Sequence, residues 1–207
     1  GGGVFVTQRN AKGKTKAQLK AEIASFQEIR RGMGAPPLWV ATDQEGGAVQ
    51  KLSPPLEARV GLRQVASEDV AAYAAAQAAE LKDLGVTVNL APVVDLNPGK
   101  LYRGDRYTKI SQRAISDNPE QVIQVARAYN QAFRAGGVVP TLKHFPGLRL
   151  ATGDTHLRPV TVDVAVAELE QRDWRPFREL LNQDTWLMLG HVIVPDLGDM
   201  PVSYSPQ

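Results

Sequence analysis

The order of apolar runs along the chain limits its fold more than any other feature of the sequence. Short, continuously apolar runs alternate with longer segments of helical periodicity. We expect strands at residues 4–7, 38–42, 86–91, 138–142 and 186–189, and helices at residues 15–31, 67–84, 119–135 and 163–182. This alternation, with strands apolar on both faces, is typical of a parallel sheet covered by helices. The sequence therefore predicts an α/β fold in one domain, residues 1–207.

Glycine and proline residues set several of the expected helix boundaries. Gly85 and the pair Gly136-Gly137 end the second and third helices. Pro119 fits the first turn of the third helix, where its missing N–H costs no hydrogen bond. Pro176 is expected to interrupt the last helical region.

The composition excludes several classes of function. The 207 residues are 43% hydrophobic and 22% charged, which is ordinary for a globular protein with one sizeable core. The formal net charge is +2, and no basic block indicates a nucleic-acid partner. Cysteine is absent, which excludes disulfides and thiolate chemistry, and no apolar run reaches the ~20 residues of a membrane helix. We expect no cofactor, because Gly1–Gly3 lacks the spacing of a phosphate-binding loop, and no metal, because no ligand spacing supports one.

Polar residues follow the carboxyl ends of the expected strands. Asp43, the region of Asp95, the pair Lys143-His144 and His191 each come after one of these strands. In parallel α/β folds this edge carries the ligand site, because strand ends and the loops after them converge there. A closed barrel and an open sheet both predict this arrangement, so it indicates a site without choosing between the two folds.

Asp154 and His156 are separated by one residue. In an extended loop, alternate side chains point the same way, so both can face one cleft. A carboxylate beside an imidazole favours the charged form of the ring and fixes its tautomer, which suits a group that donates and accepts protons near neutral pH. The ordinary alternative is a surface loop with an incidental Asp-x-His.

Three other positions also have two interpretations. Lys143-His144 either grips sugar hydroxyls or an anion, or consists of a lysine that reaches solvent and a histidine satisfied in the core. The acids of residues 43–47 (DQEGG) either bind hydroxyls or a cation, or serve turn chemistry. A histidine placed like His191 is more often packed than catalytic.

Five separated segments resemble one known family in order and spacing. They are residues 2–10 (GGVFVTQRN), 43–50 (DQEGGAVQ), 90–95 (LAPVVD), 112–116 (QRAIS) with 118–119 (NP), and the loop that runs from 143–147 (KHFPG) to 154–156 (DTH). The family is glycoside hydrolase family 3, in particular its bacterial β-N-acetylglucosaminidase branch. The resemblance covers nearly the whole chain, and the DQEGG and KHFPG segments are the most specific.

The resemblance implies a (β/α)8 TIM-type barrel and a retaining exo-glycosidase without a cofactor. The acid/base would be His156, paired with Asp154. The residues that grip the terminal sugar would be Asp43, Lys51, Arg113, Lys143 and His144, although the family usually has Arg at position 51. The substrate would be an oligosaccharide with a terminal N-acetylglucosamine, of cell-wall or chitin type. The His-Asp pair would replace the second carboxylate of a double-displacement mechanism.

Three alternatives to this interpretation are a family 3 β-glucosidase-like hydrolase, a non-catalytic sugar-binding fragment and a doubly wound nucleotide-binding protein. The Asp-Thr-His loop separates the first from the acetylglucosaminidase branch. The second is open because the family's nucleophile, an Asp of an Asp-Asp-Leu-type motif, is expected beyond Gln207. The third lacks a phosphate-binding loop after the first strand.

The resemblance also indicates a longer polypeptide. About five of the eight βα units of such a barrel are recognisable, so we expect the chain to be truncated at both ends and inactive as 207 residues alone. Leu148-Arg149 stands where the family usually has His-Gly or Leu-Gly, which is expected to alter the loop's geometry. A location in the bacterial cytoplasm and export both stay open, and a monomer is favoured.

Overall fold

The structure is a computed structural model that describes residues 1–100 and 106–205. Contacts between Cα atoms divide it into two units. The first comprises Gly1–Ala91 and Ala128–Thr141, and the second comprises Pro92–Arg127 and Leu142–Gln207. The units are described separately below, and the expectation of one domain stays a prediction.

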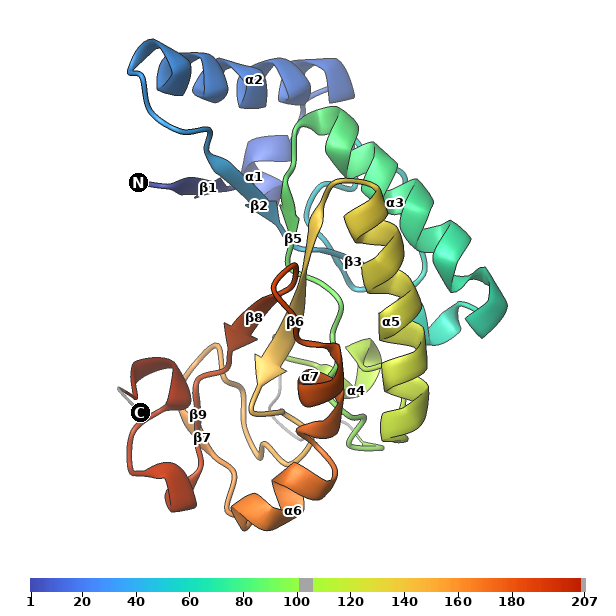
Figure 1. Cartoon of the computed structure of the whole chain (residues 1–207), viewed down its shortest axis with the longest axis vertical. Coiled ribbons are helices and arrows are strands. Elements are labelled where there is room, and N and C mark those ends of the chain that lie inside the picture. Colours follow the sequence, from blue (N-terminus) through green and yellow to red (C-terminus); the bar gives the residue numbers. More distant parts are fainter. Residues whose placement is uncertain (101–105, 206–207) are drawn as a thin grey trace. The chain divides into compact units, whose positions relative to one another are not determined.

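Parallel strands form the framework of the first unit (Figure 1). Their order is β1-β2-β5-β6, with β1 at Gly3–Phe5, β2 at Trp39–Thr42, β5 at Val88–Asn89 and β6 at Val139–Phe145, which continues into the second unit. Val4 lies opposite Val40, and Ala41 lies opposite Val88. Val40 and Val88 are fully buried, as the apolar composition of these strands predicts.

Helices and a short hairpin complete the first unit. They are α1 at Gln8–Ala11, α2 at Lys16–Gly32, α3 at Val70–Leu84, the end of α5 (Pro119–Ala135), and the antiparallel pair β3 (Gln44–Gly46) and β4 (Val49–Gln50). Thr15 begins α2 with a capping box, since its Oγ1 accepts the N–H of Gln18 at 3.2 Å and the Gln18 side chain accepts the N–H of Thr15 at 2.8 Å. Leu19 and Ile23 form the buried face of α2.

In the second unit, β8 (Trp186–Leu189) lies beside β6 in the sheet, and β7 (Val160–Thr161) pairs in parallel with β9 (Val192–Ile193). The helices of this unit are α4 at Ile110–Arg113, the start of α5, α6 at Val166–Gln171 and α7 at Arg175–Leu180. The core of the unit consists of Val93, Ile110, Ala114, Leu148, Val162, Leu169, Val192 and Val194. Across the chain, 3₁₀ turns lie at Leu62–Gln64, Ser67–Asp69, Pro195–Leu197 and Val202–Tyr204.

Most expected elements are confirmed, and the differences have local causes. The helix expected from residue 67 begins as a 3₁₀ turn and becomes α-helical only at Val70. The interruption expected at Pro176 is wrong, because the helices are broken at residues 172–174 and Pro176 lies in the first turn of α7, where a proline is tolerated. In the described part of the chain, no helix has the length and apolarity that crossing a bilayer requires.

Candidate active site

Asp95 anchors the carboxyl end of β6. Its carboxylate is fully buried, and Oδ2 accepts the backbone N–H of His144 at 3.0 Å. The same oxygen lies 2.7 Å from Nδ1 of the His144 ring, and Oδ1 accepts the N–H of Leu148 at 2.8 Å. A carboxylate only accepts, so the proton of this imidazole is on Nδ1. Asp95 therefore orients His144 and leaves Nε2 as a hydrogen-bond acceptor.

The surroundings of His144 keep its ring neutral. Burial is the largest influence and lowers the pKa of His144 below its usual value. Asp95 opposes that shift, while the positive charges of Arg113 and Lys143 add to it. The His144 side chain is 14% exposed, so a ligand can still reach it. A neutral imidazole with an unprotonated Nε2 can accept a hydrogen bond from a sugar hydroxyl.

Lys143 is buried rather than directed to solvent. The residue is only 1% exposed, which overturns the interpretation of it as a strand-terminal lysine that reaches water. The β6 backbone holds it in place, because the Lys143 carbonyl accepts the N–H of Val94 at 3.0 Å and residue 143 bridges Val93 in parallel. Burying an ammonium group costs free energy, so a buried lysine beside His144 is an unusual feature of this strand end.

Asp154 organises the loop that carries His156. It is 4% exposed, and its Oδ2 accepts the backbone N–H groups of Arg106 and Tyr107 at 3.0 and 2.8 Å. Its Oδ1 accepts the hydroxyl of Thr108 at 3.1 Å and the N–H of His156 at 3.0 Å. Burial is the largest influence and opposes ionisation, but these four hydrogen bonds together lower the pKa of Asp154 to about 2. The carboxylate is therefore charged throughout the physiological pH range.

The ring of His156 lies beside that carboxylate. Its Nδ1 is 3.3 Å from Oδ1 of Asp154 and 3.3 Å from the hydroxyl oxygen of Thr108. The His156 side chain is 54% exposed, and its ring centroid lies 6.2 Å from that of Tyr107 at an interplanar angle of 57°. One edge of the imidazole is thus held by the protein, and the ring remains accessible for proton transfer.

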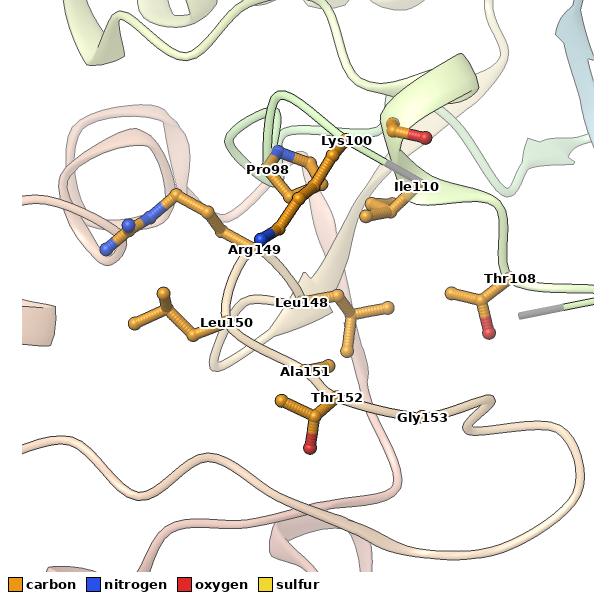
Figure 2. A pocket seen from close by; sticks show the side chains of 11 residues that line it. Pro98, Lys100, Thr108, Ile110, Leu148, Arg149, Leu150, Ala151, Thr152 and Gly153 are labelled. Carbon is orange, nitrogen blue, oxygen red and sulfur yellow. The ribbon is translucent and has the colours of Figure 1, made fainter. Parts of the chain in front are cut away.

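A pocket of about 200 Å³ borders this pair, and Thr108 is one of its lining residues. Figure 2 shows Thr108 at the edge across from Arg149, with Ile110 and Leu148 between them. The full lining comprises Pro98, Lys100, Thr108, Ile110, Ser111, Leu148, Arg149, Leu150, Ala151, Thr152 and Gly153. Five of these eleven residues have apolar side chains, and Lys100 and Arg149 add positive charge.

Arg113 is the last residue of α4 and contacts the same cluster. Its Nη1 donates to the carbonyl oxygen of Thr108 at 2.7 Å. The electrostatic influence of Arg113 on His144 places its positive charge near that ring as well. Within the second unit the structure therefore brings together Arg113, Lys143 and His144, and joins Arg113 through Thr108 to the Asp154–His156 pair.

Asp43 and Lys51 belong to the first unit, and both are partly exposed. The N–H of Lys51 donates to the carbonyl oxygen of Asp43 at 2.9 Å, which closes the β3–β4 hairpin. The turn requires glycine at Gly46, because its φ is 90° and a Cβ there would collide with the Tyr73 hydroxyl and the Val60 carbonyl. The role of Asp43 and Lys51 in sugar binding stays a prediction.

A buried polar network fixes the segment after Asp43. The N–H of Gln44 donates to Asn89 Oδ1 at 3.0 Å, and the Gln44 carbonyl accepts Asn89 Nδ2 at 2.9 Å and Gln77 Nε2 at 3.0 Å. The Tyr129 hydroxyl donates to Gln77 Oε1 at 2.9 Å and accepts from Asn89 Nδ2 at 3.0 Å. Burial raises the pKa of Tyr129 well above its ordinary value, so the hydroxyl keeps its proton.

Sequence patterns do not reveal two residues that contact His144, Asp154 or His156 in the second unit. Asp95 appears in the sequence only as part of a polar region after a strand. Thr108 gives no signal, because its side-chain contacts are with residues about 47 positions away.

The packed interpretation of His191 is wrong: the residue is exposed, its Nδ1 lies 2.7 Å from Ser203 Oγ, and its ring stacks on Tyr204. Among the residues that the structure describes, no group of three or more acidic or histidine side chains is placed to hold a metal ion.

Comparisons with known proteins identify the family of the chain. The profile of the family described as "Glycosyl hydrolase family 3 N terminal domain" matches residues 1–207. A "Beta-hexosaminidase" of Nitrosomonas eutropha is 32% identical over an alignment 216 residues long, which covers 99% of this chain and 58% of the relative. A "Beta-hexosaminidase" of Xanthomonas axonopodis pv. citri is 34% identical over 98% of this chain and 60% of its own length. The chain thus spans about three fifths of the length of these curated relatives.

Solved structures give the same result. NagZ from Neisseria gonorrhoeae, in complex with N-trifluoroacetyl-D-glucosamine, superposes with a TM-score of 0.87 and 28% identity over 99% of this chain and 60% of its own. A family 3 β-N-acetylglucosaminidase from Paenibacillus gives a TM-score of 0.84 and 29% identity over 97% of this chain and 38% of its own. A family 3 glycosyl hydrolase from Mycobacterium smegmatis is 36% identical, with a TM-score of 0.74, over 82% of this chain and 53% of its own.

Proposed function

The chain belongs to glycosyl hydrolase family 3, and from that membership we propose that its natural protein is a retaining exo-glycosidase. The TIM-like (β/α) fold expected from the sequence is the fold of this domain. The proposed substrate is a cell-wall or chitin-type saccharide with a terminal β-linked N-acetylglucosamine. The names of the relatives support that choice of sugar. The observation that carries the proposal is the placement of His156 against the charged carboxylate of Asp154.

His156 would act as the general acid and then as the general base. In the first step its protonated Nε2 gives a proton to the glycosidic oxygen as the bond from that oxygen to the anomeric carbon breaks and a nucleophile forms a bond to the same carbon. In the second step the neutral ring takes a proton from the water that releases the sugar. Asp154 stays ionised and stabilises the imidazolium form through its contact with Nδ1. The nucleophile itself remains a prediction for the region beyond Gln207.

The neighbouring residues would hold the terminal sugar. The unprotonated Nε2 of His144 accepts from a hydroxyl, whereas Lys143 and Arg113 can only donate to sugar oxygens. Because Asp95 fixes the ring of His144, that acceptor is oriented before a sugar arrives. Each sugar hydroxyl can both donate and accept a hydrogen bond, so one acceptor and two donors can bind the hydroxyls of one sugar.

Replacement of His156 tests the proposal. In the natural full-length protein, His156→Ala should lower kcat on a β-linked N-acetylglucosaminide by about 10²–10⁴-fold, the usual share of a general acid/base. The matched control is His191→Ala, because that exposed ring stacks on Tyr204 and has no part in the proposed chemistry.

Three results would contradict the proposal. Unchanged turnover in His156→Ala would remove the acid/base role. Wild-type protein that binds N-acetylglucosamine but releases none from the substrate would leave a non-catalytic sugar-binding protein. Faster turnover of β-glucosides than of N-acetylglucosaminides would indicate the β-glucosidase-like alternative.

A further inference from the structure

The hydroxyl of Thr108 contacts both Asp154 and His156. Thr108 is 2% exposed, so water does not compete for its hydroxyl. Its Oγ1 lies 3.1 Å from Asp154 Oδ1, 3.3 Å from His156 Nδ1 and 3.3 Å from the hydroxyl of Thr155. The hydroxyl thus contacts both members of the pair as well as the residue between them.

Counting protons fixes the direction of these bonds. A threonine hydroxyl has one proton, and the carboxylate of Asp154 can only accept, so the Thr108 proton goes to Asp154. The lone pairs of Thr108 Oγ1 are then available to His156 Nδ1, which must carry the proton of that contact. Nδ1–H therefore donates to Thr108 Oγ1, with the negative charge of Asp154 Oδ1 also 3.3 Å from Nδ1, and Nε2 is left for the substrate.

We propose that Thr108 is a positioning residue for the reaction: its hydroxyl bridges Asp154 and His156, and so fixes the ring orientation and tautomer that present Nε2 to the glycosidic oxygen. This inference rests on the proposed function. Thr108 does not touch the reacting atoms and acts through His156. A carboxylate that holds the ring at 3.3 Å alone leaves it freer to rotate than two acceptors do.

The backbone of Thr108 makes a separate contact with the sugar-binding side of the site. Its carbonyl oxygen accepts from Arg113 Nη1 at 2.7 Å. A change of side chain leaves that carbonyl in place. Substitution of Thr108 therefore separates the two links: the contact with the acid/base is lost, and the support of Arg113 is kept.

The kinetic test uses Thr108→Val, which keeps the shape of the side chain and removes the hydroxyl. In the natural full-length protein we expect kcat on a β-linked N-acetylglucosaminyl disaccharide to fall about tenfold, with KM unchanged. On the 4-nitrophenyl glycoside the loss in kcat/KM, which reports the first step alone, should be smaller than threefold, because that phenolate leaves without a full proton transfer. Thr108→Ser should recover most of the lost kcat, since it restores the hydroxyl.

The matched control is Thr141→Val. Within residues 1–100 and 106–205, the Thr141 hydroxyl is buried and has no hydrogen-bond partner, so the same chemical change removes no contact. Unchanged kinetics are expected. Equal losses of kcat/KM on the disaccharide and the 4-nitrophenyl glycoside in Thr108→Val, or no recovery in Thr108→Ser, would overturn the proposal and leave Thr108 a structural residue.

A second measurement does not depend on turnover. The ¹⁵N shifts of the imidazoles above pH 8, assigned with His156→Gln, report the tautomer of each neutral ring. We expect Nδ1–H at His156 in the wild type and in Thr108→Ser, with a larger Nε2–H population in Thr108→Val. Nε2–H in the wild type, or an unchanged tautomer in Thr108→Val, would overturn the proposal. The expected tautomers in a protein without turnover would instead refute only the proposed function.

Discussion

The carboxylate of Asp154 is nearly inaccessible to water, yet hydrogen bonds from the protein replace its hydration. Four donors surround it, three from the backbone and one from Thr108. This arrangement separates two properties that usually go together, because the group is buried and yet stays charged. Asp154 therefore keeps a negative charge 3.3 Å from Nδ1 of His156.

The low pKa of Asp154 predicts a specific acid sensitivity. Its folded pKa of about 2 lies below the value of about 3.9 of an unfolded aspartate, so its contribution to stability is complete above about pH 4 and is lost as the pH falls towards 2. Between pH 6 and 3 the free energy of unfolding in urea should fall more in the wild type than in Asp154→Asn. The exposed Asp199→Asn serves as control. The same pH dependence in wild type and Asp154→Asn would contradict the assignment.

At the residue scale, the sequence indicated which residues belong to the candidate site better than it indicated their hydrogen-bond partners. The one-residue spacing of Asp154 and His156 allowed both to face one cleft but left an incidental Asp-x-His open, and in the structure the two side chains are 3.3 Å apart. The tautomer of His144 could not be predicted, because it is set by Asp95, a residue 49 positions away in the chain. The burial of Lys143 could not be predicted either, because the sequence of a strand end does not show whether another element covers it.

At the scale of elements, the start of the loop that carries His156 is hydrogen-bonded to the segment between α6 and α7. Arg149 Nε and Nη2 bind Asp173 Oδ1 and Oδ2 at 2.8 and 2.7 Å, and the indole N–H of Trp174 donates to the Pro146 carbonyl at 3.0 Å. Leu148 is buried in the core between these contacts. The pair Leu148-Arg149, where the family usually has a glycine, thus gives the loop a packed side chain and a two-bond ion pair.

Removing one partner of that ion pair should be costly. The Arg149 side chain is 13% exposed and that of Asp173 is 2% exposed, so Asp173→Ala leaves a largely buried guanidinium without its main acceptor. We expect a loss of about 3 kcal/mol in the free energy of unfolding by denaturant. The control Glu28→Ala removes the carboxylate of an exposed pair with Arg31 and should cost less than about 1 kcal/mol.

A double variant makes this prediction specific to the pair. Arg149→Ala combined with Asp173→Ala should cost less than the sum of the two single changes, because no buried charge is then left without a partner. Additive losses would show that the two side chains do not stabilise each other.

Long elements were easier to recognise in the sequence than isolated pairs of short strands. Helix α5 was predicted at its observed bounds, since its apolar spacing extends over 17 residues. Strands β1 and β5 are equally short and were predicted, whereas the pairs β3–β4 and β7–β9 were missed. They are defined by tertiary pairing, which the local sequence does not contain.

At the scale of the whole molecule, sugar binding should be visible as stability. A ligand that binds only the folded chain stabilises it by about 2.7 kcal/mol at a hundredfold excess over Kd. N-acetylglucosamine should therefore raise the unfolding temperature of the natural full-length protein, and Arg113→Ala should remove most of that shift. Arg127→Ala, which alters an exposed arginine of α5, should keep it. A full shift in Arg113→Ala would exclude this arginine from the sugar site.

The predicted fold class was correct at this scale because α/β alternation is written into the whole length of the chain. The site was predicted less completely. Asp43 and Lys51 lie in the first unit, and Arg113, Lys143, His144, Asp154 and His156 lie in the second. The resemblance assigned them one task, whereas local sequence patterns describe each segment alone.

The three hydrogen bonds that Asp95 accepts have a consequence for mutational screens. A scan that scores only loss of activity would rank Asp95 with His156, since Asp95→Ala leaves two N–H groups and a ring nitrogen without their acceptor. The score would record a misplaced His144 and not a missing reactant. Screens of this protein therefore need a readout of folding beside each activity value, or the residue that builds the site will be mistaken for one that performs the chemistry.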